Sequence, residues 1–265
     1  MTKKISELLN FHGKTVVVTG GAMGIGYGIV KRFAEAKANI VIADVSADGK
    51  KKSEAISKEY GVKTLFVKTD VSSEGSVKKM ISSAVKKFGK IDVLVNDAGI
   101  FPTMSVLKMD LKFWEKIQAI NLRGVFLCCR EAARAMVKSG GGSIVNIASV
   151  DALHPSRTGL AAYDASKHGV WGFTKNLALE VADNNIRVNA IAPGGVRTEG
   201  VEKMTGGVIK AAASAQAPAF APLDVPMKRM GEPDEIALAT LFVASEAASY
   251  MTGSIVVVDG GMLLK

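Results

Sequence analysis

The chain contains few of the residues that mark disulfide-bonded or metal-binding proteins. Only two of its 265 residues are cysteines, Cys128 and Cys129, and neighbours in sequence cannot easily close an unstrained disulfide. We expect both to be small buried hydrophobic residues in a reducing compartment. The three histidines, His12, His154 and His168, are scattered, so no cluster of cysteine and histidine suggests a metal site.

Long hydrophobic segments are also lacking. No apolar run approaches the about 20 residues that a helix needs to span a bilayer. Residues 1–11 include Lys3 and Lys4 but have neither the apolar core nor the cleavage site of a secretory signal. These features predict a cytoplasmic protein with no membrane partner.

Acidic residues are outnumbered, with 25 aspartates and glutamates against 34 lysines and arginines, which gives a net charge of +9. Such a charge can signal nucleic-acid binding. The lysines of residues 77–90, however, alternate with apolar positions at helical spacing and without interleaved aromatic residues. That pattern is typical of solvated helix faces, so nucleic acid is not an expected partner. A preference for anionic substrates or an acidic carrier protein stays open.

Short segments rich in valine and isoleucine alternate with amphipathic stretches from end to end. The short segments are apolar on both faces, as strands covered by helices on both sides should be. This alternation predicts the α/β class, with a doubly wound parallel sheet of about seven strands and helices on both faces. The expected strands are residues 15–19, 39–43, 64–68, 91–95, 143–148, 186–191 and 255–258.

The chain has no internal repeat and no break in composition, which predicts a single domain over residues 1–265. Its least regular segment, residues 197–230, contains Gly206, Gly207, an alanine-rich stretch and three prolines. A long punctuated insertion in a compact domain is more often a functional lid than a packing element. We therefore expect this segment to cover the substrate.

A glycine-rich turn follows the first expected strand and opens a helix over residues 26–36. In residues 19–26 (T-G-G-A-M-G-I-G), glycine permits a close approach of backbone to a pyrophosphate, and the helix N-terminus offers unpaired N–H groups. Asp44 ends the second strand, where a carboxylate can bond both ribose hydroxyls of an adenosine and repel the 2′-phosphate of NADP. Asp70 and Val71, after the third strand, are placed to reach the adenine. Together these residues predict a dinucleotide site that prefers NAD.

Tyr163 and Lys167 are four residues apart in an expected helix and so share one face. A free tyrosine ionises near pH 10, and moving its pKa to about 7 needs roughly 4 kcal/mol. A unit charge about 4 Å away at an effective dielectric of about 20 supplies about that much. The spacing therefore suits a tyrosine tuned for general acid–base chemistry.

Several motifs in the same order resemble those of the short-chain dehydrogenase/reductase family, along nearly the whole chain. The glycine turn is similar to the family's T-G-x-x-x-G-x-G, and residues 96–99 (N-D-A-G) are similar to its N-N-A-G. Residues 193–198 resemble the segment that clasps the nicotinamide carboxamide, and residues 259–261 (D-G-G) a closing signature. The positions that fall in the order of the family's catalytic tetrad are Asn121, Ser149, Tyr163 and Lys167.

The resemblance implies a Rossmann-type oxidoreductase, a homotetramer, and a role for each tetrad residue. Tyr163 as phenolate removes the alcohol proton, Lys167 lowers the pKa of that phenol and bonds the nicotinamide ribose, and Ser149 hydrogen-bonds the reacting oxygen. Asn121 holds a water that links Lys167 to solvent. The expected cofactor-binding residues are Gly20, Met23, Gly24, Ile25, Gly26, Asp44, Asp70, Val71, Asn96, Ala98, Gly99, Tyr163, Lys167, Pro193, Gly194, Val196 and Thr198.

One position departs from the family pattern: Asp97 replaces the second asparagine of N-N-A-G. That asparagine normally braces the sheet by hydrogen bonds, and a carboxylate loses its donor. We expect a local stability cost without loss of catalysis, because Asn96 is expected to face the cofactor.

The substrate is less defined than the reaction. The expected reaction interconverts a secondary alcohol and a ketone or lactone, and Ser149, Asp151, His154 and Tyr163 are the candidate substrate contacts. The NAD preference and the polar residues Asp151, His154 and Ser156 near the expected mouth of the site favour a sugar or polyol. The basic surface favours an alternative, 3-oxoacyl-[acyl-carrier-protein] reduction. A non-catalytic nucleotide-binding protein on the same fold is a further alternative, which the intact tetrad disfavours.

Overall fold

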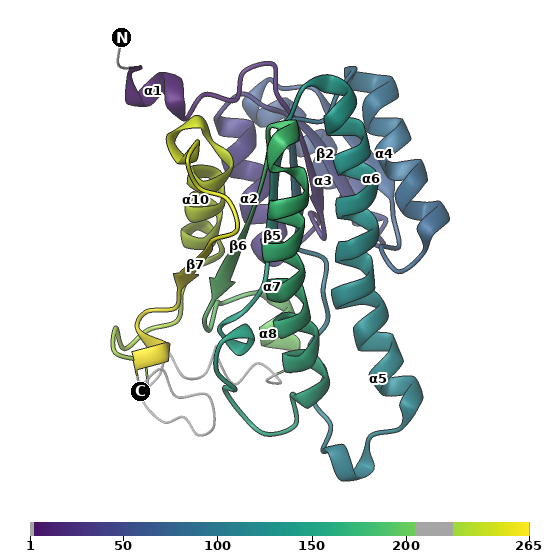
Figure 1. The fold of residues 1–265 in the computed structure, drawn as a ribbon, viewed down its shortest axis with the longest axis vertical. Helices are drawn as coiled ribbons and strands as arrows, with labels where there is room; N and C mark the ends of the chain where they lie inside the picture. The colour runs from purple at the N-terminus through teal and green to yellow at the C-terminus, as the bar shows by residue number, and fades with distance from the viewer. Residues whose placement is uncertain (1–2, 205–224, 265) are drawn as a thin grey trace.

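A seven-stranded sheet forms the centre of the molecule (Figure 1). The computed structural model describes residues 3–204 and 225–264. The strands follow the order β3-β2-β1-β4-β5-β6-β7, and each neighbouring pair is parallel. All seven predicted strands are present, with bounds within two residues of the prediction: β1 Thr15–Thr19, β2 Asn39–Asp44, β3 Thr64–Lys68, β4 Val93–Asn96, β5 Gly142–Ile147, β6 Ile186–Pro193 and β7 Ile255–Val258.

Helices cover both faces of the sheet, and each layer encloses its own core. On one face, α4 (Glu74–Phe88), α6 (Gly124–Ser139) and α7 (Ala161–Val181) pack over buried strand residues. On the other face, α2 (Gly24–Glu35), α3 (Asp48–Tyr60) and α10 (Pro233–Ala244) do the same. The strands are apolar throughout because both of their faces are buried. Other described helices are α1 (Ile5–Leu8), α5 (Leu111–Gln118) and α8 (Glu199–Met204).

The order of the strands reverses at β1. The chain builds β2 and β3 on one side of β1, then crosses to place β4 and the later strands on its other side. In an open parallel sheet, such a reversal leaves a crevice at the carboxyl ends of the strands, where ligands bind. The glycine turn follows β1 and therefore lies at this crevice.

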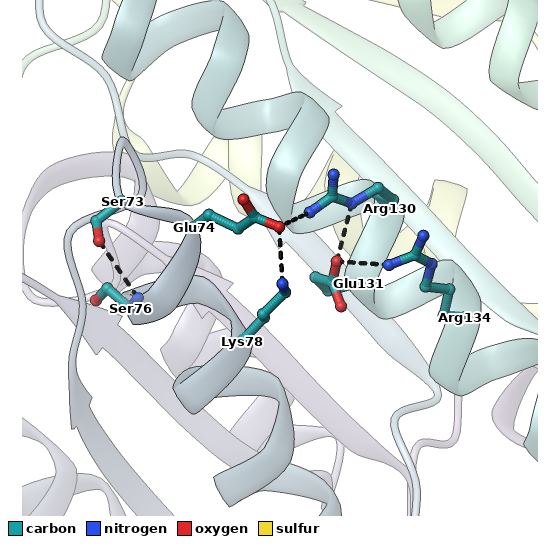
Figure 2. Close-up of polar contacts among 7 residues, drawn as sticks. All are labelled: Ser73, Glu74, Ser76, Lys78, Arg130, Glu131 and Arg134. Carbon is teal, nitrogen blue, oxygen red and sulfur yellow. Dashed lines mark hydrogen bonds and ion pairs between the residues drawn. The ribbon is translucent and has the colours of Figure 1, made fainter.

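Charged side chains on the surface of α4 and α6 pair with one another. Figure 2 shows Glu74 of α4 between two cations, with its Oε1 2.8 Å from Lys78 Nζ and 2.6 Å from Arg130 Nη2. Arg130 Nε also lies 2.8 Å from Glu131 Oε1. Exposed pairs of this kind contribute little stability individually. They do partly neutralise the positive charge on helix faces that the sequence predicts to be solvated.

The predicted lid, residues 197–230, belongs only in part to the described structure, since residues 205–224 lie outside it. Its two ends lie together, because Val196 and Gly231 form a parallel β-bridge. Within residues 3–204 and 225–264, no helix combines the length and the apolar character required to cross a bilayer.

Candidate active site

A cavity of about 500 Å³ opens at the carboxyl ends of the strands. Its walls come from the segments that follow β1 to β6, from the start of α7, and from residues near the C-terminus. One end is formed by the glycine turn and Asp44, and we call it the dinucleotide end. The other is formed by Ser149, Tyr163 and Lys167, and we call it the substrate end.

The glycine turn is shaped by close backbone contacts. Gly20 has a φ of +68°, and a Cβ there would lie 2.9 Å from the backbone of Ala98. Gly24 begins α2 with a φ of +54°, a conformation that favours glycine. A Cβ on Gly26 would lie 2.2 Å from the carbonyl oxygen of Gly20. The turn brings the N-terminus of α2 to the cavity, a position that suits a phosphate group, although the Gly24 and Gly26 N–H groups bond the Glu199 and Asp97 carboxylates in this structure.

Asp44 is held at the end of β2 by local hydrogen bonds and is 8% exposed. Its Oδ2 accepts from the Ala22 N–H at 3.0 Å, and its Oδ1 accepts from the Ser46 N–H at 2.9 Å. The carboxylate thus ties the glycine turn to the second strand and still lines the cavity. Asp70, Val71, Ala98 and Gly99 line the same end, as do Met23 and Ile25.

The side chains of Asn96 and Asp97 are placed opposite to the sequence-based expectation. Asn96 is 3% exposed, and its Nδ2 donates to Asn146 Oδ1 of β5 at 2.8 Å, so this side chain braces the sheet and does not line the cavity. Asp97 lines the cavity and accepts a hydrogen bond from the Gly26 N–H. Consecutive strand residues point to opposite faces, and the strand ends between these two. Burial raises the pKa of Asp97 from 3.8 to about 7, although the charge of Lys167 opposes this shift.

Tyr163 and Lys167 lie on one face of α7, as predicted. Lys167 Nζ is 5.6 Å from the centre of the Tyr163 ring and donates to the Ile147 carbonyl oxygen at 2.7 Å. Burial lowers the pKa of Lys167 to about 8, while the charges of Asp97 and Asp151 oppose this shift. Lys167 thus remains largely protonated at neutral pH.

The pKa of Tyr163 differs from the expectation. Burial, with smaller effects of Asp151, Asp164 and Asp97, raises it above its ordinary value, whereas a hydrogen bond with Ser149 lowers it. Burial and the charges of carboxylates distant in sequence act on this phenol, and the spacing of Tyr163 and Lys167 does not reveal either effect. In the protein without a cofactor, the phenol is therefore protonated at neutral pH.

Asn121 lies in a π-helical segment, Ala119–Arg123, between α5 and α6, and is fully buried. Its Oδ1 accepts from the Ile100 N–H at 2.9 Å, and its Nδ2 donates to the Ile100 carbonyl oxygen at 2.8 Å. Nδ2 also donates to Ser166 Oγ at 3.2 Å. The side chain joins the segment after β4 to α7 behind the cavity. Its expected part in a water relay remains a prediction.

The segment after β5 brings Ser149 and Asp151 to the substrate end. Ser149 Oγ donates to Asp151 Oδ2 at 2.9 Å, and both residues are 6% exposed. His154, the other candidate substrate contact in this segment, is exposed and does not line the cavity, and its Nδ1 lies 3.0 Å from the Pro155 carbonyl oxygen. The structure thus brings Asp151 to the site but not the His154 side chain.

The segment after β6 closes the cavity from the opposite side. Pro193, Gly194, Val196 and Thr198 all line it, as the resemblance implies. A Cβ on Gly194 would lie 2.8 Å from Asp259 Cα, which explains why glycine occurs where the D-G-G segment packs against the end of β6.

Several residues at or beside the cavity have no clear signal in the sequence. Phe101 lies edge-on to the Tyr163 ring, with centroids 6.2 Å apart. Glu199 reaches back to the glycine turn, where its Oε2 accepts from the Gly24 N–H at 3.0 Å. Met230 and Met262 also line the cavity, from segments far along the chain. Only the folded arrangement shows that these residues meet, since no local pattern distinguishes them from packing residues.

Comparison with known proteins gives consistent matches over most of the chain. Residues 20–263 match a family model described as enoyl-(acyl carrier protein) reductase. The 3-oxoacyl-[acyl-carrier-protein] reductase FabG of Chlamydia muridarum is 39% identical over 250 residues, 94% of this chain and 97% of that protein. The 3beta-hydroxysteroid dehydrogenase 2 of Eggerthella lenta is 39% identical over 254 residues, 94% of each chain. A short-chain type dehydrogenase/reductase from Mycobacterium marinum superposes with a TM-score of 0.90 at 34% identity, covering 99% of this chain and 100% of that one.

Proposed function

Because the chain belongs to the short-chain dehydrogenase/reductase family, we propose that this oxidoreductase interconverts a secondary alcohol and its ketone with NAD(H). The observation that carries the proposal is the shared cavity, which has the glycine turn and Asp44 at one end and Ser149, Tyr163 and Lys167 at the other. The bound nicotinamide would accept hydride from the alcohol carbon or donate it to the carbonyl carbon.

The substrate-end residues would move the proton that accompanies hydride transfer. The Tyr163 hydroxyl would protonate the carbonyl oxygen during reduction and, as phenolate, take the proton back during oxidation. Lys167, a buried cation in contact with the ring face, would stabilise the phenolate. Ser149, in the segment after β5, lines the same cavity as Tyr163, where it can hydrogen-bond the reacting oxygen.

The preference for NAD over NADP follows from the charges at the dinucleotide end. A 2′-phosphate beside Asp44 would bring like charges together. Of the described residues that line the cavity, the only cations are Lys167 and Arg157, and both belong to the substrate-end segments. The family uses both cofactors, so this preference is part of the proposal and depends on Asp44.

The lining of the substrate end favours a carbonyl compound with apolar flanks. Phe101, Leu160, Val201 and Met230 contribute apolar surface there. Both Asp151 oxygens are already hydrogen-bonded within the chain, and the His154 side chain lies outside the lining. Asp151 and His154 therefore give less support to a sugar or polyol substrate than their positions in the sequence suggest. An apolar ketone or a 3-oxoacyl group is supported better.

A substrate panel tests this proposal. Apolar cyclic alcohols, 3-hydroxyacyl thioesters, and sugars or polyols would each be assayed with NAD⁺ and NADP⁺ by absorbance of the reduced cofactor. We expect NAD⁺-linked turnover, highest with the apolar or acyl substrates. Preferential reduction of carrier-bound 3-oxoacyl groups with NADPH would favour the carrier-protein reductase instead. Cofactor binding without turnover of any compound would favour the non-catalytic alternative.

We also propose a homotetramer, in which α6 and α7 form one interface and the C-terminal strand region another. Apolar side chains on these surfaces support it, because Phe126 is 40% exposed, Leu179 is 80% exposed and Tyr250 is fully exposed. Light scattering coupled to size exclusion measures the mass directly. A mass near the 27.8 kDa of one chain would contradict the proposal.

A further inference from the structure

A short 3-10 turn, Met262–Leu264, follows β7 and is fixed by the side chain of Asp259. One oxygen of this carboxylate, Oδ1, accepts from the Gly261 N–H at 2.7 Å, and the other, Oδ2, accepts from the Leu263 N–H at 2.8 Å. Gly260 and Gly261 lead into the turn with φ values of +64° and +89°, which residues other than glycine rarely adopt. Specific hydrogen bonds and backbone geometry therefore determine where this turn lies.

The turn is packed between the segment after β6 and the segment before α10. A Cβ on Gly194 would lie 2.8 Å from Asp259 Cα, so the start of the turn adjoins the segment that the family resemblance expects at the nicotinamide. On the other side, the Gly260 carbonyl oxygen accepts from the Met227 N–H at 3.1 Å. These contacts place the turn at the substrate end of the cavity.

Two methionines line the cavity from these neighbouring segments, Met262 from the turn and Met230 from the segment before α10. The Cε atom of Met230 lies 3.9 Å from the position that a Cβ on Gly195 would take, so this side chain reaches the segment after β6. Met262 is half-buried, whereas Leu264 of the same turn is 84% exposed and is absent from the described lining. The turn thus presents one apolar side chain to the cavity and another to solvent.

The other apolar residues of the substrate end have less freedom to move. Phe101 lies edge-on to the Tyr163 ring, with centroids 6.2 Å apart. Leu160 directly precedes α7 and is 5% exposed. Methionine, in contrast, is unbranched and has three rotatable bonds, so it adapts to irregular space. The methionine side of the cavity is therefore where the room for a substrate can vary.

We infer that Met262 is a specificity-determining residue: together with Met230 it forms an adaptable apolar wall that limits the size of the group beside the reacting carbonyl carbon. The inference rests on the proposed function, because it assigns Met262 a role in substrate selection for that reaction. It narrows the substrate class to apolar ketones and 3-oxoacyl compounds whose apolar group fits against this wall. Size, more than polarity, then decides between two such substrates.

A homologous series of 2-alkanols of increasing chain length, assayed with NAD⁺, measures the size limit. In Met262→Ala, the ratio of kcat/KM for the longest over the shortest alcohol should rise about tenfold, because the shortened side chain leaves room for further methylene groups. Met262→Phe fills that room and should lower the ratio by about the same factor. Met262→Leu has a similar volume and should keep the ratio within about twofold of wild type.

Leu264→Ala is the matched control, since it shortens an apolar side chain of the same turn outside the described lining. The ratio should stay at its wild-type value in this variant. A shift in Leu264→Ala equal to that in Met262→Ala would overturn the inference, because it would show a general loosening of the turn. An unchanged ratio in both Met262→Ala and Met262→Phe would overturn it as well.

Binding of unreactive compounds separates the inference from the proposed function. Fatty amides of the same chain lengths carry a carbonyl group but are not reduced, and the change in NADH fluorescence gives their dissociation constants in the complex with NADH. We expect Met262→Ala to favour the longer amides and Met262→Phe the shorter ones. Absence of both shifts would overturn the inference. Failure of the wild-type protein to oxidise any alcohol, with NADH bound, would instead contradict the proposed function, while the amides still report whether Met262 limits the bound group.

Discussion

The two ends of the cavity are built in different ways. The dinucleotide end is mostly backbone, in which glycines of one short turn approach Ala98 and Gly20 closely, and Asp44 is fixed by two neighbouring N–H groups. The substrate end depends on side chains from separate segments, among them Ser149 after β5, Tyr163 on α7 and Met230 near α10. Geometry at the first end follows from local sequence, whereas chemistry at the second follows from which side chains meet after folding.

Charge also distinguishes the two ends. Asp44 forms its described hydrogen bonds with backbone N–H groups only, so its charge remains available to select a cofactor. At the substrate end, Lys167 is surrounded by the charges of Asp97 and Asp151, which act against the effect of burial on its pKa. A change in one charge should thus alter cofactor choice at the first end and proton transfer at the second.

The largest expected effect comes from Tyr163→Phe, which should reduce catalysis at the substrate end and leave cofactor binding at the dinucleotide end unchanged. Removing the hydroxyl deletes the proton donor, so turnover should fall by about 10²-fold or more. The dissociation constant for NAD⁺ should change by less than about twofold, because the dinucleotide end is intact. Steady-state kinetics and isothermal titration calorimetry measure the two quantities. Wild-type turnover would contradict the assignment, and a large loss of NAD⁺ affinity would show that the two ends are not independent.

At the dinucleotide end, Asp44→Asn should change cofactor choice without changing proton transfer. The amide can still accept one backbone hydrogen bond but no longer repels a 2′-phosphate. The ratio of kcat/KM for NAD⁺ over NADP⁺ should fall on the order of 30-fold. Asp70→Asn, an exposed carboxylate after the next strand, is the matched control and should change the ratio much less. An unchanged ratio in Asp44→Asn would place cofactor selection elsewhere.

Asp97 lies between the two ends, and Asp97→Asn should raise stability in a pH-dependent way. The folded protein raises the pKa of Asp97 from 3.8 to about 7, so it binds this proton more tightly than the unfolded chain. Stability therefore falls as pH rises from about 4 to about 7. Asp97→Asn should be more stable than wild type by on the order of 2 kcal/mol at pH 8, since this half-buried carboxylate keeps part of its hydration.

Thermal or urea unfolding at pH 5 and pH 8 measures this effect. The two proteins should differ less at pH 5 than at pH 8, because only part of the loss between pH 4 and pH 7 has occurred at pH 5. Asp183→Asn, an exposed carboxylate far from the cavity, should show no such pH dependence. A lower melting temperature for Asp97→Asn at pH 8 would mean that the carboxylate contributes favourably through the Gly26 N–H.

The sequence predicts most of the dinucleotide end but less of the substrate end, for a physical reason. Alternating apolar segments identify all seven strands, and the glycine turn and Asp44 follow strand ends whose positions the sheet determines. The direction of the Asn96 and Asp97 side chains depends on where β4 ends, which a motif does not specify. The pKa of Tyr163 depends on burial and on carboxylates distant in sequence, so a spacing of four residues is not sufficient to predict it.

Glu199, in the segment after β6, hydrogen-bonds the glycine turn at the dinucleotide end. Its carboxylate accepts from the Gly24 N–H at the start of α2, where a phosphate would also bind. An exposed carboxylate at a helix N-terminus is a weak competitor, so Glu199→Ala should tighten NAD⁺ binding by about threefold. Isothermal titration calorimetry at low ionic strength measures the change, and Glu180→Ala, exposed at the far end of α7, is the matched control.

The dependence of NAD⁺ affinity on salt concentration in Glu199→Ala distinguishes between two roles of the Glu199 carboxylate. If the carboxylate competes with the cofactor phosphates, the gain in affinity should shrink at 0.5 M salt, because exposed charges are screened there. If Glu199 instead helps to close α8 over the bound cofactor, its removal should weaken NAD⁺ binding at every salt concentration. Glu199→Gln separates charge from hydrogen bonding, since the amide can still accept from Gly24 but does not repel a phosphate. Affinity in Glu199→Gln equal to that of wild type would show that charge repulsion is not the cause.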